Sequence, residues 1–127
     1  MKEVIFVITM LLCLKLATSD TAQAFYYTGP YVPSYCFNTQ QNGEKIVKLG
    51  NRLWNEHSCG NVYKVWCKSD VTSQPCTDPR GTTFGEIVEV VGPCDDCNGV
   101  DMLLSQSAFF NITTSTVPFE ITYSRLL

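Results

Sequence analysis

The spacing of hydrophobic residues predicts one helix in the middle of the chain. Ile46, Leu49 and Leu53 recur every three or four residues, which places them on one face of a helix over 44–55. Gly50 lies inside this segment and weakens the expected helix by about 1 kcal/mol relative to alanine. We therefore expect a helix here with an apolar face turned toward the core.

Elsewhere the apolar residues follow a period of two, which is typical of strands. This pattern predicts strands over 25–28, 62–67, 83–91, 101–104 and 119–123. Ser105 is placed to cap a short helix that runs through Phe110 and buries Ala108 and Phe109. The segment 69–81 holds two prolines and many small polar residues, and we expect a loop there. Many strands with one or two short helices favour a small barrel, because a closed sheet has no exposed edges.

The start of the chain predicts a secretion signal rather than a part of the fold. An apolar run over 4–14 follows Lys2 and ends before Lys15. The run is shorter than the ~20 residues that a membrane-spanning helix needs. We therefore expect residues 1–24 to be a cleaved signal peptide, and no later stretch predicts insertion into a membrane.

The cleavage position rests on small residues. Ala22 and Ala24 form a pair that fits signal peptidase, which places the cut after Ala24 and leaves 25–127 as one mature domain. Earlier cleavage near Thr18 or Ser19 is the alternative.

Cysteine usage also indicates export. One of the seven cysteines leaves with the signal, and an even number in a short secreted chain predicts three disulfides. The residues alone leave their connectivity open. The six that remain are Cys36, Cys59, Cys67, Cys76, Cys94 and Cys97. Asn111 opens an Asn-Ile-Thr sequon and is a candidate glycosylation site.

Charge and the remaining polar residues argue against several function classes. The net charge is −3 and the basic residues lie apart, so we expect neither nucleic acid nor an anionic membrane surface as a partner. His57 is the one histidine, which leaves Cys94 and Cys97 without a second ligand pair for zinc. Asp95 and Asp96 between these cysteines disfavour a redox-active thiolate. We therefore expect no metal and no cofactor.

Several motifs follow one another in an order that resembles a known family. They are FYYT at 25–28, 30–31, 33–36, LWN at 53–55, CGNVYKVWC at 59–67, 75–76, 88–91, the Cys94/Cys97 pair and LSQSAF at 104–109. In this order the chain resembles the plant natriuretic peptides, which are single-domain, expansin-like secreted proteins related to family-45 endoglucanases. The resemblance implies a mainly β fold, a six-stranded double-psi β-barrel stapled by three disulfides. It also implies the pairing Cys36–Cys59, Cys67–Cys76 and Cys94–Cys97.

The resemblance further implies that this chain is not an enzyme. Glycoside cleavage needs two carboxylates on either side of the bond, and the two positions that match the acids of the related enzymes and expansins are Gly92 and Leu103. Asp101 would share a strand face with Leu103, and the expansin groove has a tyrosine that matches Tyr27. The polysaccharide-groove candidates are Tyr27, Asp101, Asp95 and Asp96; the alternative is that the three aspartates form a solvated acidic turn.

The resemblance implies a secreted, non-enzymatic apoplastic protein that acts in signalling or stress response, on water and solute homeostasis or in defence. The family's activity maps here to 45–68, and its charged residues are receptor-contact candidates or simply solvated. They are Lys45, Lys48, Arg52, Glu56, Lys64 and Lys68. The alternatives are a cell-wall polysaccharide-binding module and a defence-related protein-binding module. We expect a monomer whose partner is a cell-surface receptor or a cell-wall polysaccharide.

Overall fold

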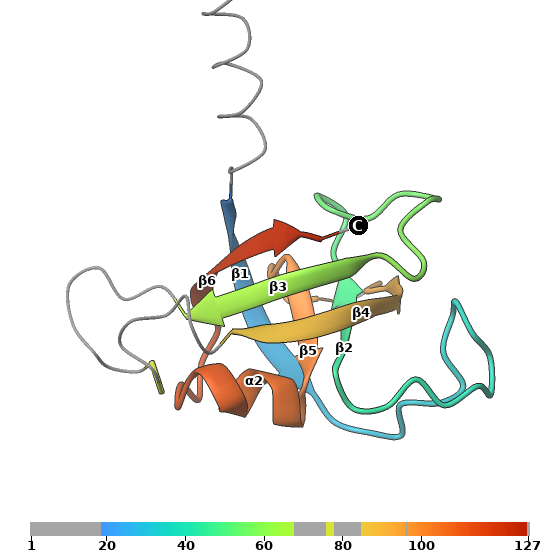
Figure 1. Cartoon of the computed structure of the whole chain (residues 1–127), viewed down its shortest axis with the longest axis horizontal. Coiled ribbons are helices and arrows are strands. Elements are labelled where there is room, and N and C mark those ends of the chain that lie inside the picture. The colour runs from blue at the N-terminus through green and yellow to red at the C-terminus, as the bar shows by residue number, and fades with distance from the viewer. Residues whose placement is uncertain (1–18, 68–75, 78–84, 96, 127) are drawn as a thin grey trace, which may run out of the picture.

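Six strands close into one barrel with a short helix at one end (Figure 1). This computed structural model describes residues 19–67, 76–77, 85–95 and 97–126. The elements are β1 (Asp20–Tyr27), β2 (Ile46–Leu49), β3 (Val62–Cys67), β4 (Glu86–Pro93), β5 (Met102–Ser105), α2 (Gln106–Ile112) and β6 (Phe119–Arg125). The expected mainly β barrel is confirmed. Residues 1–18 of the expected signal, most of the expected 69–81 loop, Lys68 and Asp96 lie outside the described residues.

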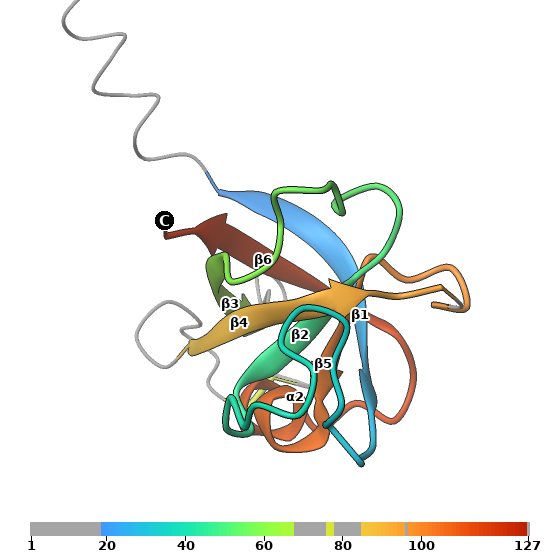
Figure 2. The ribbon, with the colours of Figure 1, turned by 90° about the vertical axis from the view of Figure 1, so that its right-hand side faces the viewer.

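The strand order makes most neighbours distant in sequence. Around the barrel the order is β1-β5-β2-β4-β3-β6, with β6 again beside β1 (Figure 2). β1 runs parallel to β5, and β2 runs parallel to β4, whereas the other pairs are antiparallel. The pair β3 and β4 is the one in which neighbours also follow each other along the chain. The barrel is therefore held by long-range pairing.

The helix closes one end of the core. Ser105 caps α2 by accepting a hydrogen bond from the Ala108 backbone N–H, as expected, and α2 continues to Ile112. Phe109 is fully buried, and its ring centroid lies 5.6 Å from that of Tyr26. None of the described helices is long and apolar enough to cross a bilayer.

The helix expected over 44–55 is wrong, because β2 occupies its first half and turns follow. Val47 and Leu49 point into the barrel core, where both are fully buried. Ile46 is 1% exposed but lies outside that core cluster, and it lines a hollow with residues 40–44. A strand that is buried on both faces carries apolar residues without strict alternation of apolar and polar positions. Here their spacing matched that of the apolar face of a helix.

Gly50 has a packing role instead of a helical one. A Cβ atom built on Gly50 would lie 2.8 Å from the Val100 carbonyl oxygen, which is too close for any side chain. The Gly50 N–H donates to the Asp101 carbonyl at 2.8 Å. Glycine therefore lets the chain leaving β2 pass directly against the segment that leads into β5.

Three disulfides fasten the loops to the barrel. They join Cys36 to Cys59, Cys67 to Cys76 and Cys94 to Cys97, which is the pairing that the resemblance implies. The first ties the loop after β1 to the turns before β3.

Candidate functional site

A polar hollow of about 180 Å³ lies on the outside of the barrel. Tyr27 reaches it from the end of β1, Lys48 from the outward face of β2, and Asp95 from the loop closed by the Cys94–Cys97 disulfide. Tyr31 and Tyr35, from the loop that follows β1, complete much of the wall. The hollow therefore combines one cation, one anion and three phenol rings.

Tyr27 lines this hollow and carries an unsatisfied hydroxyl. Its oxygen is buried and has no hydrogen-bond partner among the described residues. Burial, and secondly the nearby Tyr31, raise the pKa of Tyr27 far above the ordinary tyrosine value, so the hydroxyl stays protonated. A buried hydroxyl without a partner costs about 1–3 kcal/mol. A hydroxyl or carbonyl group that reached this oxygen would remove that cost.

Lys48 lies directly over the Tyr27 ring. Its Nζ atom is 4.6 Å from the ring centroid, a cation–π contact. In the part of the chain that the structure describes, Lys48 forms no ion pair. The ammonium group therefore keeps hydrogen-bond donors for a ligand.

Lys48 also lies between Gly92 and Leu103, the two positions that match the catalytic acids of the related enzymes. It pairs with Gly92 on β4 and with Leu103 on β5. A Cβ atom on Gly92 would lie only 2.8 Å from the Cβ of Tyr35, because the loop carrying Tyr35 is bonded to β4 through the Cys36 N–H and the Val91 carbonyl. Of the two matched positions, Gly92 is therefore covered by Tyr35, and Leu103 is apolar.

Tyr31 connects this hollow with its surroundings. Its hydroxyl donates to the Tyr27 carbonyl at 3.1 Å and accepts from the Gln106 N–H at 3.1 Å, which joins β1 to the first turn of α2. Tyr31 also lines two further hollows of about 190 and 420 Å³.

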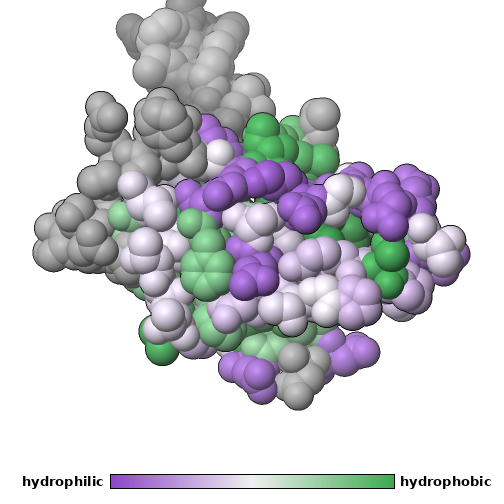
Figure 3. Space-filling model, turned by 90° about the horizontal axis from the view of Figure 1, so that it is seen from below, coloured by the Kyte–Doolittle hydropathy of each residue, from purple (hydrophilic) through white to green (hydrophobic). Residues whose placement is uncertain are grey.

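Seen from below Figure 1, the surface is mostly hydrophilic or neutral, with apolar areas that are small and separate (Figure 3).

Asp101 is not part of the hollow. It lies beside Gln23, whose N–H donates to the Asp101 carboxylate at 2.9 Å, and Tyr27 is four residues further along β1. At ~3.3 Å per residue this separates the two sites by about 13 Å. The structure thus brings Tyr27 and Asp95 together but places Asp101 elsewhere; Asp96 lies outside the described residues.

Asp101 is instead held by Arg52. The guanidinium donates from Nε at 3.0 Å and from Nη2 at 3.1 Å, and Nη2 also donates to the Thr21 carbonyl. The hydrogen bonds from Arg52 are the main cause that lowers the pKa of Asp101 below its ordinary value. The same bonds raise the pKa of Arg52. This pair fixes the first half of β1 against the segment before β5.

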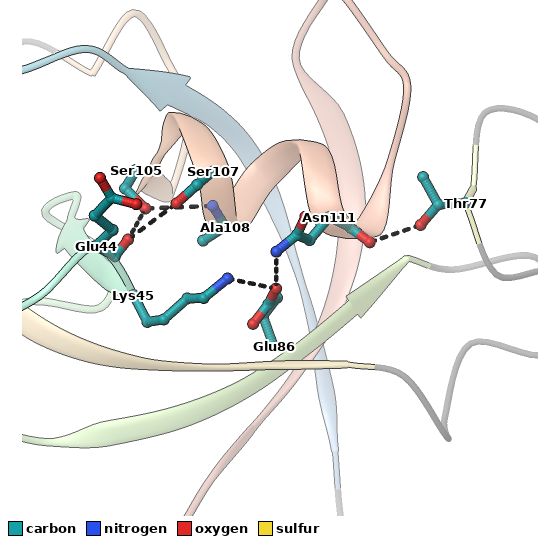
Figure 4. A network of polar contacts seen from close by, with 8 residues as sticks. All are labelled: Glu44, Lys45, Thr77, Glu86, Ser105, Ser107, Ala108 and Asn111. Carbon is teal, nitrogen blue, oxygen red and sulfur yellow. Dashed lines mark hydrogen bonds and ion pairs between the residues drawn. The ribbon is translucent and has the colours of Figure 1, made fainter.

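A second polar network joins α2 to β4 (Figure 4). The Glu86 carboxylate accepts hydrogen bonds from Lys45 Nζ at 2.8 Å and from the Asn111 side-chain amide. The Asn111 carbonyl accepts from Thr77 Oγ1 at 2.7 Å. Thr113 of the sequon is fully buried, so glycosylation at Asn111 would have to precede folding; it stays a prediction.

Three of the receptor-contact candidates make contacts with other side chains of the fold. Lys45 is paired with Glu86 and Arg52 with Asp101, while Lys64 on β3 lies over the Trp66 ring at 5.9 Å. Among the described candidates, Glu56 stands out because its side chain is 86% exposed, as is that of its neighbour His57. Lys68 is outside the described residues.

The sequence named Tyr27 and Lys48 separately but did not predict that they meet. Tyr31 and Tyr35 were not among the candidates either. Their spacing offered a signal, since Tyr27, Tyr31 and Tyr35 recur every four residues in a proline-containing segment. That spacing does not say which rings line a hollow.

Comparison with known proteins identifies the family. No family model matches the chain. The chain is 31% identical over 116 residues to an EG45-like domain containing protein from Citrus jambhiri, covering 87% of this chain and 85% of that protein. It is 37% identical over 98 residues to EG45-like domain containing protein 2 from Arabidopsis thaliana, covering 74% and 70%. The chain belongs to the EG45-like domain proteins.

This EG45-like protein also shares its fold with a crystallised expansin from Clavibacter michiganensis. The TM-score is 0.63 at 16% identity, and the match covers 87% of this chain and 51% of the expansin chain. The likeness therefore shows the fold alone, and the EG45-like chain spans about half the length of that expansin. The expansin-like family resemblance drawn from the motifs is confirmed.

Proposed function

We propose that this protein is an extracellular saccharide-binding protein and that its ligand occupies the hollow between Tyr27, Lys48 and Asp95. The observation that carries the proposal is that Tyr27, whose buried hydroxyl has no partner among the described residues, lines this hollow together with Lys48, whose ammonium group lies over the Tyr27 ring. Sugar hydroxyls both donate and accept hydrogen bonds, so the hydroxyls of one sugar ring can bond to the phenol, the ammonium group and the carboxylate.

Aromatic surface supports the same ligand class. Tyr35 is 73% exposed, and its ring meets the Trp54 ring edge-on at 5.6 Å. Such a ring offers an apolar face to the C–H face of a sugar while its hydroxyl stays in water. The link to cell-wall polysaccharides comes from the expansin-like fold, and three disulfides fit an oxidising, extracellular site of action.

We further propose that binding is not followed by hydrolysis. Hydrolysis requires an acid and a second carboxylate about 5–9.5 Å apart. Asp95 lines the hollow, whereas Asp101 is paired with Arg52 and lies beside Gln23, four residues from Tyr27 along β1. The two matched positions, Gly92 and Leu103, offer no carboxylate. Release of reducing sugar that disappears in Asp95→Asn or Asp101→Asn would overturn this part.

The test is binding of the secreted protein to insoluble cellulose, xylan and pectin in a pull-down assay. Tyr27→Phe removes only the unpartnered hydroxyl, and because one hydrogen bond contributes about 0.5–1.5 kcal/mol, we expect binding to weaken about 2–12-fold. Lys48→Met keeps the aliphatic stem and removes the charge, and we expect a loss of about tenfold or more, since bonds from charged groups contribute about 1.5–3 kcal/mol.

Lys64→Met is the matched control, because Lys64 also lies over an aromatic ring but on β3, away from the hollow. It should leave binding unchanged. Absence of binding to every polysaccharide, or binding that is indifferent to Tyr27→Phe and Lys48→Met, contradicts the proposed function.

Apoplastic signalling of the natriuretic type is the second candidate. The observation that favours it is the exposed Glu56–His57 turn, which the Cys36–Cys59 disulfide holds against the barrel. A synthetic peptide of residues 45–68 tests the site. If the whole protein causes protoplast swelling and the peptide does not, the site is not contained in this segment; if Glu56→Gln in the whole protein has no effect, the turn is not the contact.

A further inference from the structure

We propose that the signal peptide is removed between Ser19 and Asp20, rather than after Ala24 as the sequence alone favours. The inference rests on the role of residues 20–24 in the folded barrel and is independent of the ligand.

Residues 20–24 make the whole seam between β1 and β6. Every pairing between these strands lies there, from Asp20 opposite Tyr123 to Ala24 opposite Phe119. Cleavage after Ala24 would leave β1 paired with β5 alone. The barrel would then open, and β6 would carry an unpaired edge, which is a site of aggregation.

The same residues contribute to the core. Ala22 is 3% exposed and Ala24 is fully buried, and both belong to the core cluster. Their removal by cleavage would expose to solvent the core residues that they cover. Ala22 and Ala24 form the small-residue pair that fits signal peptidase, but in the folded domain they are buried parts of β1. Cleavage after Ala24 would therefore remove a part of the core.

Polar contacts of residues 20–24 also reach other parts of the fold. Arg52 Nη2 donates to the Thr21 carbonyl at 3.1 Å. Gln23 exchanges two bonds with Asp101, its N–H donating to the carboxylate at 2.9 Å and its carbonyl accepting from the Asp101 N–H at 2.7 Å. Removal of residues 20–24 would leave the Asp101 N–H without its backbone acceptor.

A second small-residue pair lies just before the strand. Ala17 and Ser19 are separated by one residue, as signal peptidase requires of the positions before its cut. Ser19 is exposed and precedes the first residue of β1. Cleavage after Ser19 therefore removes no part of the strand.

The experiment is secretion of the full chain with its own leader, followed by N-terminal sequencing and intact mass of the secreted protein. We expect the mature protein to begin at Asp20. A mature protein that begins at Phe25, or one that retains Met1, contradicts the proposal.

Two variants of the leader sharpen this test. Ser19→Tyr puts a bulky residue immediately before the proposed cut, and we expect loss of the Asp20 terminus. Thr18→Tyr is the matched control, because the position between the two small residues is unrestricted, and it should still yield Asp20. Normal processing of Ser19→Tyr overturns the assignment.

A folding comparison tests the physical reason separately. Residues 20–127 and 25–127 are secreted behind the same foreign signal peptide, and their thermal unfolding is followed by circular dichroism. The longer form should unfold cooperatively, and the shorter one should lose this transition or melt at least about 10 °C lower. Equal melting temperatures would contradict the proposed role of residues 20–24.

Discussion

Replacing Asp101 with asparagine tests whether the Arg52 clamp holds the first half of β1. The Asp101 carboxylate accepts bonds on both oxygens, from Arg52 Nε on Oδ1 and from Arg52 Nη2 and the Gln23 N–H on Oδ2. Asparagine has one acceptor oxygen and one amide group of donors. In either orientation Asp101→Asn therefore turns a donor toward a donor.

The size of the loss follows from exposure. The Arg52 side chain is 51% exposed and that of Asp101 is 20% exposed, so solvent screens much of the ion pair. An exposed pair contributes up to about 1 kcal/mol, and the bond from Gln23 adds about 0.5–1.5 kcal/mol. We expect Asp101→Asn to lower the free energy of unfolding by about 1–2 kcal/mol at pH 7, or roughly 5–10 °C in Tm.

The loss should depend on pH. Arg52 holds the pKa of Asp101 below its ordinary value in the folded protein, whereas an unfolded aspartate titrates near about 3.9. The stabilisation is therefore present above about pH 4 and is lost as the pH falls through the lower folded pKa. The difference between wild type and Asp101→Asn should shrink as the pH approaches about 2.

Urea unfolding followed by tryptophan fluorescence at pH 7 and at low pH measures both effects. Glu56→Gln is the control, because Glu56 lies 3.5 Å from His57 and both side chains are 86% exposed; it should not change stability. The reasoning is refuted if Asp101→Asn is as stable as wild type at pH 7, or if its deficit is undiminished at low pH.

Two further substitutions test the core and the covered acid position. Phe109→Ala should lower the free energy of unfolding by about 3–5 kcal/mol in urea melts, because Phe109 is fully buried and its loss leaves a cavity; a cost below 1 kcal/mol would contradict this packing. Gly92→Asp should cost about 1–3 kcal/mol, since its Cβ would lie 2.8 Å from that of Tyr35, and should release no reducing sugar from cellulose. Unchanged stability of Gly92→Asp would show that Tyr35 does not cover the position.

The sequence predicted the fold class because most strands are buried on one face. In β3 the alternation between half-buried and buried residues is complete, and 62–67 was predicted with the right bounds. In β2 the loop before it covers Ile46 from outside while Val47 and Leu49 fill the inside. The spacing of apolar residues within a strand does not show that another segment of the chain covers its outer face. The structure was therefore needed to assign β2.

The candidate site was harder to predict because it is assembled across strands. Tyr27 and Lys48 come from strands that are not neighbours, with β5 between them. Their contact depends on the length of the lysine side chain and on the register of two strand pairings, that of β1 with β5 and that of β5 with β2. Asp101 was assigned to the groove by its strand face, whereas its partner Arg52 lies in a turn that had been expected to be helical.

The strand order has a consequence for the order of events during synthesis. β1 leaves the ribosome first, but its two neighbours in the barrel, β5 and β6, are the last strands to be made. Native pairing of β1 therefore has to wait until nearly the entire polypeptide has been synthesised. Until then its apolar residues remain without native neighbours, and folding that relies on such distant contacts is slow. The new chain is therefore most exposed to chaperones and to self-association just before its last strand is made.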